Sequence, residues 1–373
     1  MKNTKINYKK LSKLRGKNSI IRAFYLNIIQ PSKFIIFSII YEKIIKYIIS
    51  FFAFILIRAN NIEKKDTRTK VVHKVYENFS TQNFTFIWLS ITFYLLISVV
   101  PIIYIINFLN LTITDNISTL TNHVEVLTKE YNTNNTSIFQ GLFNNIIFNK
   151  FIPGGQQYFN NNEGVEVIDD SFSKLYSLIP GSFIAIPSLY ISAGGYGKII
   201  TAYNYMFSHD KVGTYWGNKL KGLFLVFAIS ILLFIFSNIY ILIYASMIKS
   251  GLSKTHWILD VFYLFFSLVF FLVSFLVLFR LTPSFKLNFK SIWRGAIIST
   301  IPTFGLLIIY TYLNKVISYS KFGSAVGFFF TVGFFINWFS YFMFLGITFN
   351  EAYYKNYIST RTIPKKVYFW LMI

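Results

Sequence analysis

Residues 222–248 read GLFLVFAISILLFIFSNIYILIYASMI, and no charged side chain interrupts them. A spanning helix needs about 20 mostly apolar residues, because the hydrocarbon layer is about 30 Å thick and each helical residue rises 1.5 Å. Backbone groups in lipid must bond within their own segment, which favours helices over strands. The sequence therefore predicts an all-α integral membrane protein, a six-span bundle with helices at 84–108, 175–197, 222–248, 261–279, 295–314 and 322–350.

The composition of the whole chain supports this fold class. Of its 373 residues 54% are hydrophobic and only 13% are charged, whereas an ordinary soluble domain has about 25% charged residues. Such a composition excludes a typical soluble enzyme and a disordered chain. The absence of Cys excludes disulfides, thiolate metal sites and a cysteine nucleophile.

The net charge of +22 is spread over segments between the apolar stretches. Residues 1–33 form a basic arm without acidic residues, and residues 34–57 place Glu42, Lys43 and Lys46 on roughly one helical face. This pattern favours an amphipathic helix lying at the membrane interface over a seventh span. With six spans and this interfacial helix, most Lys and Arg residues lie on the cytoplasmic side of the membrane. The positive-inside rule therefore predicts a plasma-membrane protein with both termini in the cytoplasm.

The predicted domain organisation has four parts. They are the arm (1–33), the interfacial helix and linker (34–83), the transmembrane domain (84–350) with a large outer loop at 109–174, and a cytoplasmic tail (351–373). The bilayer is the expected partner, with anionic headgroups contacted by Lys9, Lys10, Lys13 and Arg15. RNA binding is disfavoured because the arm precedes an interfacial helix, although the arm's charge is equally explained by topology signalling alone.

No catalytic constellation is present in the sequence. The four histidines lie far apart, and HExxH, GxxxxGK[ST] and GxSxG are all absent. We therefore expect no metal, no cofactor, no enzymatic activity and no ATP-driven transport within this chain. Charged residues inside the spans are nearly absent, which disfavours a proton-coupled pump.

Small and polar residues in the spans have two interpretations, a transport pathway or helix packing. Asn204, Thr348 and Asn350 either line a pathway or hold helices together, and packing is the commoner use. Helices containing Pro187 or Pro302 are expected to be kinked, as helices of transporter sites often are. The remaining candidates are small residues suited to close helix contact, namely Gly194, Gly195, Gly197, Gly323 and Gly327.

Four further motifs are SITFYLLISVVP at 90–101, SAGGYGKIITAYN at 192–204, FRLTPSFKLNFKSIWRGAIIS at 279–299 and the last span, which ends in LGITFN at 345–350. In this order they resemble the YihY/BrkB family of bacterial inner-membrane proteins. Asn204, Pro283 and Gly295 fall on family positions, but Thr348 stands where the family usually has a glutamate. Any role of that carboxylate is therefore not carried over to this chain.

The resemblance implies six spans, cytoplasmic termini and an envelope protein whose activity is not established, and the ribonuclease BN label of some members is regarded as a misassignment. Two hypotheses follow, a transporter or permease-like protein without ATP, or a structural or interaction protein that uses the 109–174 segment. A water-accessible cavity lined by Asn204 or Asn350 would favour transport, and a solidly packed bundle would favour interaction.

Overall fold

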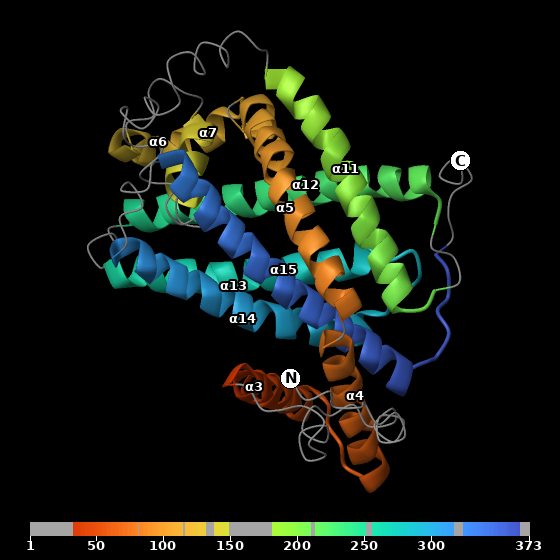
Figure 1. Ribbon diagram of the computed structural model, residues 1–373. Helices are drawn as coiled ribbons and strands as arrows, with labels where there is room; N and C mark the ends of the chain where they lie inside the picture. Colours follow the sequence, from red (N-terminus) through yellow and green to blue (C-terminus); the bar gives the residue numbers. More distant parts are fainter. Residues whose placement is uncertain are drawn as a thin grey trace, which may run out of the picture. The chain divides into compact units, whose positions relative to one another are not determined.

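The computed structural model describes residues 33–80, 82–114, 116–131, 138–148, 181–209, 213–250, 256–316 and 324–365 (Figure 1). Almost all of these residues are helical. The strand-like pairing found among the described residues is a single antiparallel bridge between Phe285 and Pro364. The all-helical fold class is therefore confirmed. The chain divides into two compact units, Met1–Glu77 and Asn78–Ile373. The basic arm with Lys9, Lys10, Lys13 and Arg15 lies outside the described residues.

The first unit contains α3 (Lys33–Leu56) and most of α4 (Ile62–Ser80). The Arg68 guanidinium lies 4.9 Å from the centroid of the Phe54 ring, and Lys46 Nζ lies 5.6 Å from that of Tyr76. These cation–π contacts join the two helices. A helix thus forms where the interfacial one is predicted, while its place at the membrane surface stays a prediction.

The second unit is a bundle of long helices. They are α5 (Gln82–Leu109) with the π-helical turn η1 (Asn110–Thr114), α6 (Ser118–Tyr131), α7 (Ile138–Leu142) with η2 (Phe143–Phe148), α11 (Gly181–Met206), α12 (Tyr215–Lys249), α13 (His256–Leu281), α14 (Phe289–Val316) and α15 (Ser324–Tyr357).

Within the described residues, five helical segments are long and apolar enough to cross a membrane. They are Ile87–Thr114, Tyr215–Lys249, Trp257–Leu281, Phe289–Thr311 and Val332–Tyr357. The helix α11, which covers most of the predicted span at 175–197, is not among these five segments. A multi-pass membrane protein is therefore supported, and a sixth span stays a prediction.

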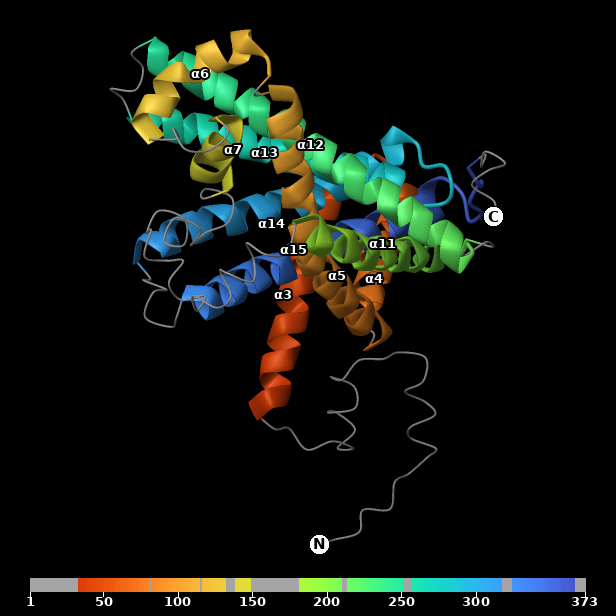
Figure 2. The same ribbon diagram turned by 90° about the horizontal axis from the view of Figure 1, so that it is seen from above.

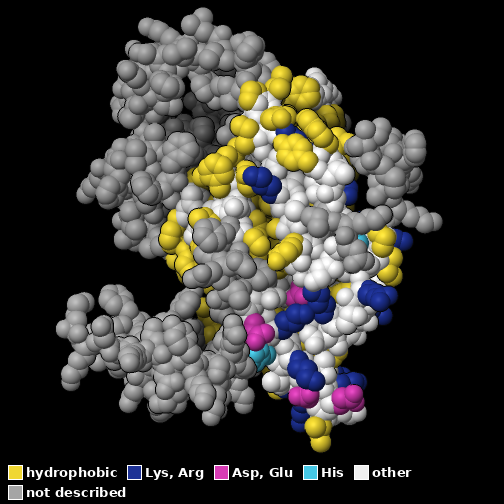
Figure 3. Space-filling view, turned by 45° about the vertical axis from the view of Figure 1, so that its right-hand side comes forward, with side chains coloured by type: hydrophobic (Ala, Val, Ile, Leu, Met, Phe, Trp, Pro, Cys, Tyr) yellow, Lys and Arg dark blue, Asp and Glu magenta, His cyan; other side chains and the backbone are white. Residues whose placement is uncertain are grey.

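The helix α12 shows why these segments require lipid. Phe224, Phe227, Ile231, Ile235 and Ile239 are exposed at a spacing of three or four residues, so they share one face of the helix. Exposed apolar faces of this size are destabilising in water and are the rule in a bilayer. Figure 3 shows one side of the molecule on which many hydrophobic side chains are exposed and only a few Lys or Arg lie among them.

Small residues allow the helices of the bundle to approach closely. The helix α11 packs on α5 and α12, and α14 packs on α13 and α15 (Figures 1 and 2). A Cβ atom added to Gly222 would clash with the Ala193 carbonyl of α11, and one added to Gly295 would clash with the Gly346 carbonyl of α15. Backbone contacts of this kind are the usual role of glycine between membrane helices.

The segment predicted as a large outer loop contains helices. Val124 and Leu127 of α6 are fully buried, and the His123 Nε2 atom lies 2.8 Å from the Ser246 hydroxyl of α12. Phe139 of α7 is fully buried as well, whereas residues 149–180 lie outside the described residues. The first part of this segment is therefore packed against the bundle.

Candidate functional site

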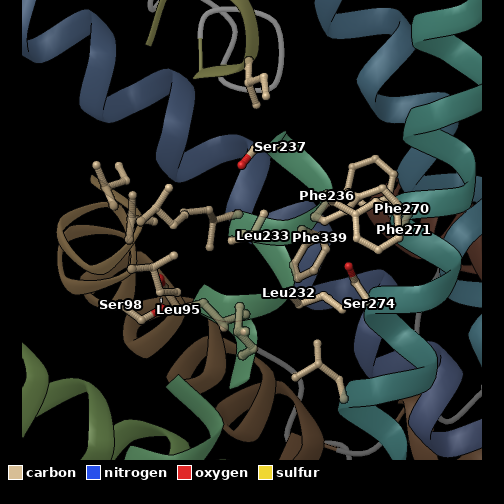
Figure 4. A pocket seen from close by; sticks show the side chains of 18 of the residues that line it. Leu95, Ser98, Leu232, Leu233, Phe236, Ser237, Phe270, Phe271, Ser274 and Phe339 are labelled. Carbon is tan, nitrogen blue, oxygen red and sulfur yellow. Dashed lines mark hydrogen bonds between the residues drawn. The ribbon is translucent and has the colours of Figure 1, made fainter. Parts of the chain in front are cut away.

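A partly open cavity of about 270 Å³ is formed by helices of the second unit. Phe236, Phe270, Phe271 and Phe339 gather on one side of it, and Leu95 of α5 lies on the other (Figure 4). Lining side chains come from α5, α11, α12, α13, α15 and η2. The cavity is formed by segments that lie far apart in the sequence, so no local sequence pattern predicts it.

The few polar groups of this cavity are three serine and two tyrosine hydroxyls. Ser98 donates to the Leu95 carbonyl at 2.7 Å, and Ser237 donates to the Phe234 carbonyl at 2.8 Å. The buried hydroxyl of Ser274 has no hydrogen-bond partner, and Figure 4 shows it turned toward the phenylalanine rings. The cavity is therefore almost wholly apolar, and Ser274 presents its one unsatisfied serine hydroxyl.

The size and chemistry of this cavity restrict what it can hold. Its volume is close to the lower end of the range of small-molecule sites, which is about 300–1,000 Å³. An apolar cavity lined by Leu, Ile and Phe stays dry, because a water molecule inside it finds too few polar partners. An ion or a sugar would lose its hydration without compensation.

A constriction adjoins one end of the cavity. A second space of about 10 Å³, roughly the room of one water molecule, is bordered by Tyr203, Phe279, Thr282 and Met343. It shares with the main cavity the residues Leu95, Tyr196 and Leu278. The small space therefore lies beside the main cavity and reaches Thr282, the residue that follows α13.

Asn204 fixes that loop to the end of α11. Its side chain is fully buried, its Nδ2 donates to the Ser284 hydroxyl at 2.9 Å, and its Oδ1 accepts from the Ser284 backbone N–H at 3.0 Å. Lys221 Nζ of α12 donates to the same hydroxyl at 3.3 Å. Asn204 thus acts here as a clamp between helices and does not line the main cavity.

The chain after α15 holds the same loop from another side. Lys365 Nζ donates to the carbonyls of Arg280 at 2.8 Å and Pro283 at 2.7 Å, where α13 ends. Such a cation satisfies carbonyls left open at a helix C-terminus. Burial, together with the charges of Lys221 and Arg280, lowers the pKa of Lys365 to about 8. Three cations therefore gather around this loop.

Asn350 joins α14 and α15. Its Oδ1 accepts from the Gly295 backbone N–H at 2.9 Å, its Nδ2 donates to the Ile292 carbonyl at 3.2 Å, and the side chain is buried. Thr348 is also buried and donates to the Leu345 carbonyl of its own helix at 2.8 Å. Neither residue lines the main cavity.

The small residues proposed from sequence lie in different surroundings. A Cβ added to Gly195 would meet the Tyr94 side chain at 2.5 Å, and one added to Gly197 would meet the Asn218 backbone at 3.1 Å, while Gly194 has open space. Pro187 and Pro302 lie inside α11 and α14, which continue through them without a break. Gly327 lies in α15, and Gly323 falls outside the described residues.

An ion pair not singled out from the sequence lies near the end of α15. The Glu351 carboxylate, with a side chain 1% exposed, binds Lys355 at 2.8 Å and accepts from Asn78 Nδ2 at 3.1 Å. The spacing of four residues is a recognisable signal for this pair. Within the described part of the chain, no three His, Asp or Glu side chains lie close enough to hold a metal ion.

Comparison with known protein families matches residues 75–367 to the family described as Virulence factor BrkB. The chain belongs to the BrkB family. The match covers α5 through α15 and includes the cavity and the loop held by Asn204, so both features lie within the BrkB region. No curated protein and no solved structure matches the chain. The family resemblance predicted from the four motifs is thus confirmed.

Proposed function

We propose that this BrkB protein is a permease-like membrane protein, independent of ATP, that takes an apolar or amphipathic molecule from the bilayer into its central cavity. The observation that carries the proposal is the apolar cavity built by five helices and η2. A bundle with a purely structural role gains stability by filling such a space, because a cavity costs on the order of 24 cal/mol per Å³.

The chemistry of the cavity defines the cargo. The hydroxyls of Ser98 and Ser237 are bonded within their own helices, which leaves apolar walls around the Ser274 hydroxyl. A hydrocarbon chain that enters the cavity from the lipid exchanges one apolar environment for another at little cost in free energy. A hydrated ion would lose its water without gaining polar partners. Lipid acyl chains are the apolar material that the exposed faces of these helices meet in a membrane.

The proposal places the protein in the plasma membrane with both termini in the cytoplasm. The basic arm, with Lys9, Lys10, Lys13 and Arg15, contacts anionic headgroups there, and neither nucleic acid nor a catalytic step has a part in the function. The pathway runs through the cavity and not along Asn204 or Asn350, whose amides are engaged in helix contacts. Passage beyond the constriction requires Tyr203 and Phe279 to move.

The test uses the full chain in phosphatidylcholine vesicles that contain a trace of fluorescent phosphatidylcholine, and dithionite bleaches the outer leaflet. We expect the purified protein to speed the bleaching of inner-leaflet lipid. Ser274→Phe, which fills the cavity, is expected to slow it at least tenfold. Ser267→Ala is the matched control, because the Ser267 hydroxyl is buried on the same helix but bonds to the Tyr263 carbonyl at 2.7 Å.

A folded protein that leaves the bleaching rate at the value of empty vesicles would contradict the proposal, as would equal rates for Ser274→Phe and the wild type. The interaction role would then be favoured. The structure offers α6 for that role, since Val126 is exposed while Val124 and Leu127 anchor the helix to the bundle.

A further inference from the structure

We propose that Ser284, Lys221 and Arg280 form a binding site for an anionic phosphate group at the loop between α13 and α14. The shared chemistry is that of a phosphate oxygen, whether it belongs to a lipid headgroup or to free phosphate. The site stands on its own contacts and does not require that the protein moves lipid.

The loop that carries Ser284 is held from three sides. Asn204 binds both the backbone N–H and the hydroxyl of Ser284, and the Lys286 N–H donates to the Ile363 carbonyl at 2.8 Å. The Phe285 ring is fully buried and lies 4.9 Å from the Phe207 ring between their centroids. A loop fixed in this way presents the Ser284 hydroxyl in one position, which is what a preorganised binding site requires.

The hydrogen bonds of the Ser284 hydroxyl leave its proton free for a ligand. A serine oxygen has two acceptor positions and one proton. Both acceptor positions are used, by Asn204 Nδ2 at 2.9 Å and by Lys221 Nζ at 3.3 Å. The proton therefore points away from both nitrogens, toward an acceptor that the described residues do not supply.

The charge near this hydroxyl is positive, because Lys221 contacts it and the charges of Lys221 and Arg280 both act on Lys365. Lys221 is half-buried, Arg280 is exposed, and Lys365 lies against the carbonyls of Arg280 and Pro283. No carboxylate among the described residues pairs with any of these three cations, since the buried Glu351 binds Lys355 and Asn78. Three cations close together repel one another, which raises the electrostatic energy of the folded protein. A bound anion attracts all three and makes this electrostatic energy favourable.

The three groups have distinct parts in the site. The Ser284 hydroxyl donates to one phosphate oxygen, and Lys221 has ammonium protons left beyond its single bond to Ser284. Arg280 offers a planar fork that matches two phosphate oxygens. Lys365 is already bonded to three carbonyls, at 2.8 Å, 3.4 Å and 2.7 Å, so it contributes charge from a fixed position.

The surroundings favour a lipid headgroup as the source of the phosphate. Trp216 and Leu220 are exposed on the first turns of α12, close to Lys221 in the sequence, and Leu281 is exposed next to Arg280. Tryptophan marks the level of the headgroups in membrane proteins. A phosphate at this level, between cations and apolar side chains, is the arrangement of an anionic phospholipid.

The experiment measures binding to the full chain purified in an uncharged detergent, by the rise of its thermal midpoint during titration. The three probes are short-chain phosphatidylglycerol, short-chain phosphatidylcholine and inorganic phosphate. We expect phosphatidylglycerol to bind at least tenfold more tightly than phosphatidylcholine. If inorganic phosphate binds and phosphatidylglycerol does not, and the variants described below weaken phosphate binding, then the site exists and its ligand is free phosphate.

The variants assign the binding to this loop. Ser284→Ala and Lys221→Gln are each expected to weaken phosphatidylglycerol binding about tenfold, which is the effect of one charge-assisted hydrogen bond. Ser284→Thr keeps the hydroxyl and is expected to bind as the wild type does. Lys290→Gln removes the same charge from an exposed lysine near the loop and is the matched control.

Three results would overturn the proposal: no binding of either anionic probe, binding unchanged in Ser284→Ala and Lys221→Gln, or equal weakening in Lys290→Gln. The last would show a response to overall charge alone. If Ser284→Ala does not fold, the comparison of Lys221→Gln with Lys221→Arg decides, because the arginine restores the charge at the same position.

Discussion

Replacing Asn204 by leucine tests whether this residue is a clamp or part of a polar pathway. Leucine has a similar size but neither donor nor acceptor, so both bonds to Ser284 are lost. The backbone N–H of Ser284 then has no acceptor, which costs roughly 1–3 kcal/mol. The loss of the bond from Asn204 Nδ2 to the Ser284 hydroxyl adds about 0.6 kcal/mol, the average found for side-chain bonds between membrane helices.

Together the two lost hydrogen bonds, offset in part by the apolar burial that leucine gains, are expected to lower the free energy of unfolding by about 2 kcal/mol. Asn204→Asp is expected to cost about 1 kcal/mol or less, because the carboxylate still accepts from the Ser284 N–H, and Lys221 binds the hydroxyl of the same serine. The exposed Asn288 provides the matched control, and Asn288→Leu is expected to change stability by less than about 0.5 kcal/mol.

The assay is unfolding of the purified chain in mixed micelles of increasing sodium dodecyl sulfate, followed by circular dichroism. The reasoning would be refuted if Asn204→Leu unfolded at the same detergent fraction as the wild type. A pathway residue, in contrast, would lose lipid movement in vesicles while keeping its stability, so the two measurements together separate the two roles of Asn204.

Further predictions concern glycine packing, the buried ion pair and Lys365. Gly222→Ala is expected to lower stability by about 1–3 kcal/mol, because the added methyl group meets the α11 backbone, whereas Gly194→Ala has open space; equal detergent midpoints would contradict this. Lys355→Met leaves the buried Glu351 carboxylate without its cation and is expected to cost about 3–5 kcal/mol, and the double variant with Glu351→Gln should recover much of the loss in the same assay. The pKa of Lys365 is about 8 in the folded protein and 10.5 ordinarily, so between these pH values the unfolded chain holds more protons and stability rises with pH. Thermal midpoints should therefore rise more steeply over this window for the wild type than for Lys365→Gln, and parallel curves would speak against the lowered pKa.

Local sequence patterns are sufficient for the helices and the family. Uncharged stretches such as 222–248 are long enough to cross a bilayer, and the structure has helices at all six predicted positions. The exact ends differ, because apolar stretches stop at the first charged residue while α12 continues through Lys219 and Lys221 to Tyr215. The four motifs indicate the BrkB family without any knowledge of tertiary contacts.

The roles of the polar residues depend on the tertiary structure. In the sequence, Asn204 and Asn350 suit a helix contact or, less commonly, a pathway, and only their partners decide between the two. Those partners lie 80 residues away for Asn204 and 55 residues away for Asn350. The sequence also contains no sign that Ser284 contacts both Asn204 and Lys221, because the loop is shaped by α11, α12 and the chain after α15 together.

The sequence by itself therefore determines that this protein is a helical membrane protein of the BrkB family, because length and hydropathy act within each segment. The cavity, the constriction beside it and the three cations around Ser284 are decided only in the folded bundle. Each arises where side chains from several helices meet, and the packing of one helix against another leaves no periodic mark on either segment.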